Sequence, residues 1–271
     1  MSFAPVVPLA GYAGWAFLKK TLSNQTAAFN KSPEITRDED YFRANIGKVK
    51  TADQLVADRR LLKVALGAFG LDADIDNKAF IRKVLSDGTL STDALSTKLA
   101  DKQYQKFSAA FGFGDFPTPS TQISTFADTI LSAYKARQFE AAVGDQSDDL
   151  RLALNAQREL APLAAKSGDD EVKWLTVLGN APLKQVFAKA LGLPAGIGSI
   201  DLEQQLTVFQ AKAQAAFGDS SVKQFTDGTK VETLIRRFLV RSQAEAVQSQ
   251  IGSGATALAM LQQTASTLRS R

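Results

Sequence analysis

The feature that most constrains the fold is a helical unit that ends at a glycine, clearest in residues 51–85, TADQLVADRRLLKVALGAFGLDADIDNKAFIRKVL. Thr51 and Gln54 fit a capping box, in which both side chains bond backbone amides at a helix start. Apolar residues then recur at spacings of three, four and seven, as on a buried helix face. Gly70 followed by apolar Leu71 is typical of a helix end with a left-handed residue. The unit predicts one helix before the glycine and a second after a short acidic loop.

The same ending recurs at Gly112 and Gly192, with uneven spacing that excludes a fixed-period solenoid. One interpretation is a weak internal duplication, in which residues 51–85 match roughly 175–209. The other is a general way of ending a helix. Alternating β-branched runs are absent, and apolar spacing is of the helical kind nearly everywhere. The sequence therefore predicts an all-α fold, an irregular multi-helix bundle.

The 271 residues can form one continuous domain or two regions. The strongest break is the segment FGDFPTP, residues 113–119. It divides an N-terminal helical region, 1–115, from a C-terminal helical region, 116–271. We expect a long helix over about 229–250, and a helical tail from Gly254.

The chain contains no Cys and no His. Thiolate and imidazole metal sites, Cys nucleophiles and histidine bases are therefore excluded, which leaves carboxylate, lysine, tyrosine or Ser-Lys chemistry. Residues 72–77 resemble the start of a calcium loop, but Asn77 and Lys83 stand where glycine and a bidentate glutamate are needed. The sequence predicts no metal, no cofactor and no catalytic residue.

The net charge of +4 comes from 32 basic and 28 acidic residues, a mixture that argues against a dedicated nucleic-acid binder. No apolar run approaches the roughly 20 residues of a membrane span. The apolar N-terminus is interrupted by prolines and glycines and has no basic leader, so we expect no secretory signal peptide.

Two groups of residues are candidates for partner binding. Arg237 and Arg241 belong, with Arg236, to the densest basic cluster. Glu232 lies four residues before Arg236 and Glu245 four after Arg241, and these pairs are expected to neutralise the cluster in part. This face is either solvated or a partner-binding patch.

The second group lies in the tail and follows heptad spacing. Ile251 and Leu258 share one heptad position, with Ala265, and Leu261 and Leu268 share the other, with Gly254. This seam either docks on the protein's own core or associates with another helix. With an apolar stripe in a predicted helix from about Gly11 to Phe29, it indicates terminal helices that pair with each other or with a partner.

Three segments together resemble the DUF1217 family of uncharacterised proteins: YFRANIGKVKTADQLVADRRLLKVALGAFGLD, VETLIRRFLVRSQ and ATALAMLQQTASTL. Members occur in alphaproteobacteria and are associated with flagellar gene clusters. The resemblance implies an all-helical protein linked to the flagellum, and it brings no catalytic residue.

We therefore expect a non-enzymatic assembly or interaction protein that binds protein partners, among them flagellar components, through apolar helix faces. It would be cytoplasmic or exported to the flagellum. The alternatives are an enzyme that uses carboxylate or lysine chemistry, and a cytoplasmic export chaperone or regulator. The oligomeric state is left open.

Overall fold

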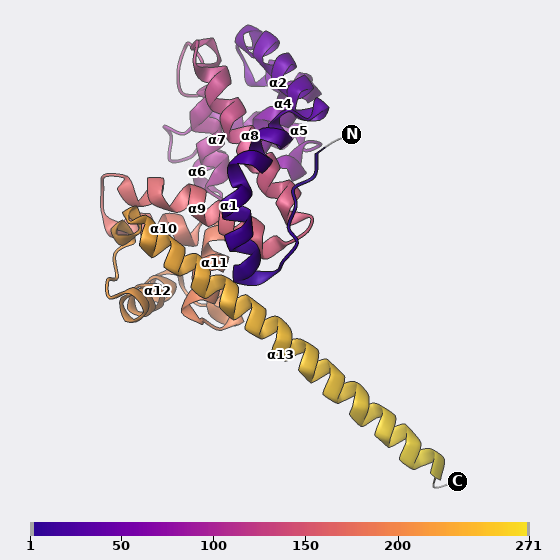
Figure 1. Ribbon diagram of the computed structural model, residues 1–271. Coiled ribbons are helices and arrows are strands. Elements are labelled where there is room, and N and C mark those ends of the chain that lie inside the picture. The colour runs from indigo at the N-terminus through magenta and orange to yellow at the C-terminus, as the bar shows by residue number, and fades with distance from the viewer. Residues whose placement is uncertain (1–2, 270–271) are drawn as a thin grey trace.

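The computed structural model describes residues 3–269, and the side chains of residues 3–249. Over that range the chain is built from helices, which confirms the all-α prediction (Figure 1). The elements in chain order are α1 (Gly11–Asn30), α2 (Pro33–Asn45), η1 (Ile46–Lys48), α3 (Ala52–Ala57), α4 (Arg59–Gly67), η2 (Asp72–Asp74), α5 (Lys78–Asp87), α6 (Leu95–Lys98), α7 (Gln103–Phe111), η3 (Ser120–Gln122), α8 (Phe126–Gly144), α9 (Asp148–Ala165), α10 (Asp170–Leu178), α11 (Ala181–Leu191), η4 (Ala195–Ser199), α12 (Leu202–Phe217), η5 (Val222–Thr226) and α13 (Gly228–Arg269), where η denotes a 3-10 helix.

The unit at residues 51–85 begins with the predicted cap, since Thr51 Oγ1 accepts a hydrogen bond from the Gln54 amide at 3.3 Å. The single helix predicted before the glycine is wrong, because the chain breaks at Asp58. The Asp58 carboxylate accepts from two backbone N–H groups in the first turn of α4. This side chain competes with the helical backbone, as aspartates do, and starts a new helix.

The glycine endings have the predicted geometry. Gly70 and Gly192 have φ of 72° and 69°. The amide of the following residue donates to a carbonyl five residues earlier, at 3.0 Å after Gly70 and 2.8 Å after Gly192. Each ending leads through a 3-10 turn into another helix. Both interpretations, a duplication or a common helix ending, lead to this geometry, so the duplication stays a prediction.

Buried apolar side chains form two clusters. The first, here the N-terminal core, runs from Ile35 to Tyr134 and includes residues of α2–α5, α7 and the start of α8. The second, the C-terminal core, runs from Phe139 to Leu239 and also takes Trp15 and Leu18 from α1. Helix α8 therefore contributes to both cores. The division into regions 1–115 and 116–271 stays a prediction, because a buried cluster is not in itself a domain.

Helix α13 is continuous from Gly228 to Arg269, so the tail is helical, as expected, but the helix end expected at about residue 250 is wrong. A glycine inside a helix costs only about 1 kcal/mol, and it ends the helix only where the backbone turns left-handed. The first part of α13 packs on α1, α9 and α11 and buries Val231, Leu234, Ile235, Phe238 and Leu239. The helix then runs away from the other helices (Figure 1).

The segment that precedes α1 is held by Gln25 of α1, which is buried. Its carboxamide accepts from the Val6 amide at 2.7 Å and donates to the Val6 carbonyl at 3.1 Å. Gln25 interrupts the apolar stripe of α1 because it binds extended backbone rather than another helix.

We expect Phe238→Ala to lower the free energy of unfolding by about 3–5 kcal/mol, because the side chain is fully buried and its removal leaves a cavity. Urea unfolding followed by circular dichroism measures the change. The matched control is Val240→Ala, two residues away on the exposed face, with an expected change within about 0.5 kcal/mol. Equal effects of the two variants would contradict the orientation of α13.

Candidate interaction surface

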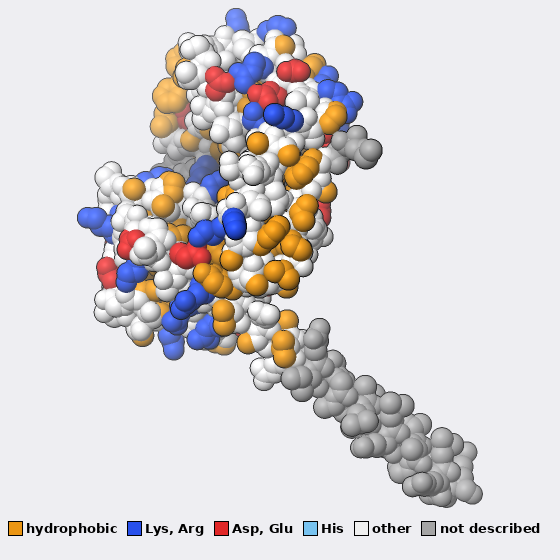
Figure 2. All heavy atoms as spheres, viewed as in Figure 1, with side chains coloured by type: hydrophobic (Ala, Val, Ile, Leu, Met, Phe, Trp, Pro, Cys, Tyr) orange, Lys and Arg blue, Asp and Glu red, His pale blue; other side chains and the backbone are white. Residues whose placement is uncertain are grey.

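An exposed apolar stripe lies on α13 opposite the core. Val240 and Val247 are 52% and 49% exposed, and Ala244 between them is also exposed. Val240 lies nine residues, or two and a half turns, after the buried Val231, so the two side chains point in opposite directions. Apolar side chains are visible on α13 where it leaves the rest of the molecule (Figure 2).

This stripe continues the heptad seam predicted in the tail. Val240 and Val247 precede Gly254 by 14 and 7 residues and share its heptad position, whereas Ala244 precedes Ile251 by seven. They are not among the residues predicted from the sequence, although the same spacing continued backwards leads to them. The side chains of Ile251, Leu258, Leu261 and Leu268 lie outside the described residues, so their role in partner binding stays a prediction.

Arg237 and Arg241 lie against the C-terminal end of α11. Arg237 Nε donates to the Ala190 carbonyl at 3.3 Å, and its guanidinium lies 5.6 Å from the centre of the Phe217 ring. The Arg241 guanidinium lies beside Gly192, the residue that ends α11. Cations are stabilised at this end of a helix by its unpaired carbonyls and its dipole. Both arginines thus make contacts within the chain, and their partner-binding role stays a prediction.

The carboxylates expected to neutralise these arginines pair with other elements instead. Glu232 binds Lys19 of α1 at 2.8 Å, and Glu245 binds Lys189 of α11 at 3.3 Å. The expected pairs within α13 are therefore wrong. A spacing of four residues permits an ion pair within the helix, but such a pair stabilises the helix by only about 0.5 kcal/mol. Packing against neighbouring helices therefore decides which partner each carboxylate binds.

Glu232 joins α1 to the first turns of α13. Besides Lys19, its carboxylate accepts from Tyr12 Oη at 3.1 Å and from Trp15 Nε1 at 3.2 Å. Burial raises the pKa of Glu232, but these three donors outweigh burial and hold its pKa below the ordinary value. Helix α1 and the first turns of α13 therefore contact each other through residues 12–19 and 232, whereas the pairing predicted for the tail seam stays a prediction.

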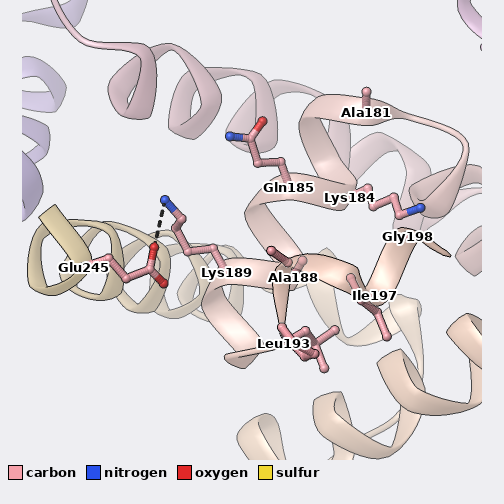
Figure 3. A pocket seen from close by; sticks show the side chains of 11 residues that line it. Ala181, Lys184, Gln185, Ala188, Lys189, Leu193, Ile197, Gly198 and Glu245 are labelled. Atoms are coloured by element: carbon pink, nitrogen blue, oxygen red, sulfur yellow. Dashed lines mark ion pairs between the residues drawn. The ribbon is translucent and has the colours of Figure 1, made fainter. Parts of the chain in front are cut away.

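A pocket of about 380 Å³ lies between α11, the loop at residues 193–198 and Glu245 of α13 (Figure 3). Ala188, Leu193 and Ile197 form an apolar wall, and Lys184 lies at its edge. Glu245 is about 140° around the helix from Val240, because each residue turns the helix by about 100°. The pocket and the stripe are thus on different sides of α13 and form no common surface.

The part of the chain that the structure describes contains no group of three or more acidic side chains placed to hold a metal ion. No helix in it is long and apolar enough to cross a membrane.

We expect Glu232→Gln to destabilise the protein by about 1–2 kcal/mol near neutral pH, since hydrogen bonds to a charged group are lost at a partly exposed site. A carboxylate with a lowered folded-state pKa stabilises the fold above its ordinary pKa, about 4.5, and loses this effect as the pH falls through the folded-state pKa. The difference from the wild type, measured by urea unfolding at several pH values, should therefore vanish in acid.

Glu245→Gln is the matched control, because that side chain is 61% exposed and its ion pair should contribute little. A difference between wild type and Glu232→Gln that persists below the folded-state pKa would contradict the role given to the carboxylate.

Comparison with known proteins agrees with the fold. The chain is similar to a crystal structure of an Agrobacterium tumefaciens protein from structural genomics, with a TM-score of 0.73 and 24% identity. The similarity covers 89% of this chain and 99% of the other. At this identity it shows the fold alone. No curated protein matches the chain.

The model of one protein family, described as a protein of unknown function (DUF1217), matches residues 68–231, which is more than half of the chain. The resemblance inferred from the sequence is thereby confirmed, and the chain belongs to the DUF1217 family.

Proposed function

We propose that this protein is a non-enzymatic assembly protein that binds a helical protein partner through the apolar seam of α13, and that its setting is the flagellum. The observation that carries the proposal is the exposed stripe of Val240, Ala244 and Val247, in register with the heptad positions that follow.

The seam has the spacing of a paired helix. From Val240 to Leu268 the steps alternate between four and three residues, the pattern that keeps one side of a helix facing its partner. Burying a valine or leucine side chain is worth about 1.5–3 kcal/mol. Several such residues on one face provide enough free energy to hold a partner helix, even after the cost of association.

The sequence around the seam favours recognition by packing rather than by charge. No Asp, Glu, Lys or Arg occurs between Glu245 and Arg269. A helix exposed to water normally carries charged residues on its outer face. Outside a core, a helix also lacks the tertiary packing from which most helical stability comes. Both arguments indicate that a second helix covers this part of α13.

The flagellar setting is supported by the resemblance of residues 41–72, 231–243 and 255–268 to a family associated with flagellar gene clusters. An export chaperone would use the same seam to hold its substrate, so only the identity of the partner separates it from a structural component. A carboxylate- or lysine-based enzyme would instead need two such groups converging in a pocket.

We expect Val240→Glu combined with Val247→Glu to weaken partner binding by at least about a hundredfold, because each charge would be buried without a pair. The measurement is co-purification of the tagged full-length protein from flagellated cells of its host, with the recovered proteins identified by mass spectrometry. Sedimentation of the purified chain shows whether the partner is a second copy.

The matched control is Ala246→Glu combined with Ser249→Glu, which adds the same charge on the same helix away from the seam. Partner recovery that survives the seam substitutions would remove the proposal. Recovery of a non-flagellar partner that only the seam variant loses would retain the binding mechanism and remove the flagellar setting.

A further inference from the structure

A small polar pocket lies where the two cores meet. Its volume is about 220 Å³, and α7, α8, α9 and the start of α11 line it. That volume is below the roughly 300–1,000 Å³ of clefts that hold drug-sized ligands. The pocket thus suits a molecule with few non-hydrogen atoms.

Three of its lining residues carry a buried polar atom without a hydrogen-bond partner among the described residues: Asn155 Oδ1, Gln103 Oε1 and Arg137 Nε. Asn155 is only 4% exposed. A buried polar group without a hydrogen-bond partner destabilises the fold, so native proteins rarely keep several together without a ligand or ordered water. The two amides need a donor, and the guanidinium needs an acceptor.

Arg137 is positioned to bind an anion. Its Nη2 donates to Glu159 Oε1 at 3.0 Å, whereas its Nε–H is buried and has no partner among the described residues. Gly70 makes room for the guanidinium, because a Cβ there would lie 2.8 Å from Nη1. Burial, and then the neighbouring Arg158, lower the pKa of Arg137, although the carboxylates of Glu159, Glu140 and Asp72 act in the opposite direction.

The charged groups around Arg137 leave its Nε–H free. Lys106, Arg137 and Arg158 pair with the carboxylates of Glu140 and Glu159, and the Asp72 carboxylate also acts on Arg137. None of these carboxylates accepts from Arg137 Nε. A carboxylate group in the pocket would supply that acceptor.

The opposite requirement holds at the rim. Asp72 and Asp101 line the same pocket and are exposed, and the buried Gln103 Oε1 is a further acceptor in the lining. These groups favour a cation. A molecule that matches both ends must carry an anionic and a cationic group a short distance apart.

We propose that this pocket binds a free amino acid or a similar small zwitterion. Its carboxylate accepts from Arg137 Nε–H, and its ammonium group donates to Asn155 Oδ1 and Gln103 Oε1. All three unpartnered atoms are then satisfied. The inference is independent of the association proposed for α13, since it concerns residues of other helices.

The test is thermal unfolding of the full-length protein with glycine, alanine or serine at millimolar concentration, followed by calorimetric titration. We expect a melting temperature that rises with the concentration of at least one of them. Glycinamide lacks the carboxylate and N-acetylglycine lacks the ammonium group, and neither should raise it.

Two variants locate the site. Asn155→Ala and Gln103→Ala should each weaken binding about tenfold or more, because a hydrogen bond to a charged group is lost. Gln103 is partly exposed, so its variant remains folded even if Asn155→Ala does not. Gln157→Ala, on the exposed side of α9, is the matched control and should leave affinity unchanged.

The proposal is overturned if no amino acid raises the melting temperature, in which case ordered water satisfies the three atoms. It is also overturned if glycinamide or N-acetylglycine acts as well as glycine, or if binding survives both pocket substitutions.

Discussion

The burial of one face of α13 against α1, α9 and α11 is the interaction on which the C-terminal core depends. Starting a helix is costly and extending it is not, because each further residue adds a hydrogen bond for one more ordered residue. The buried turns of α13 therefore provide the nucleus from which the later turns continue. The same burial sets the direction in which the exposed stripe faces, since residues on one helix keep a fixed angular relation.

The contact between α1 and α13 joins segments more than 200 residues apart, and three side chains of α1 bond one carboxylate there. The Glu232 carboxylate is stabilised at the edge of the core because two aromatic side chains donate hydrogen bonds to it and Lys19 supplies the opposite charge. The entropy cost of closing a long loop grows only slowly with its length. A contact between segments this far apart therefore costs little more entropy than a contact across a shorter loop. It brings the N-terminal helix to the place where α13 leaves the core.

The junction between the two cores differs physically from the cores themselves. Inside each core apolar and aromatic side chains pack closely, whereas at the junction α8 and α9 present an ionic cluster around Arg158. Charged groups removed from water need several partners, and such networks specify one arrangement of the helices. Charged side chains are removed from water at this junction, where apolar side chains are the usual choice. Binding sites are expected at places that depart from the usual pattern in this way.

The sequence by itself determined the elements with a strong local cause. Helical spacing showed an all-α chain, Thr51 and Gly70 marked helix ends through their own side chain or its absence, and the seven-residue spacing of the tail predicted an apolar seam. The tertiary structure alone decided which groups separated in the chain come together. It split a helix at Asp58, paired Glu232 with α1, and placed Asn155, Gln103 and Arg137 around one pocket. The reason is energetic: a cap or a helical stripe acts within a few residues, whereas a weak polar pair is chosen by the packing of whole helices.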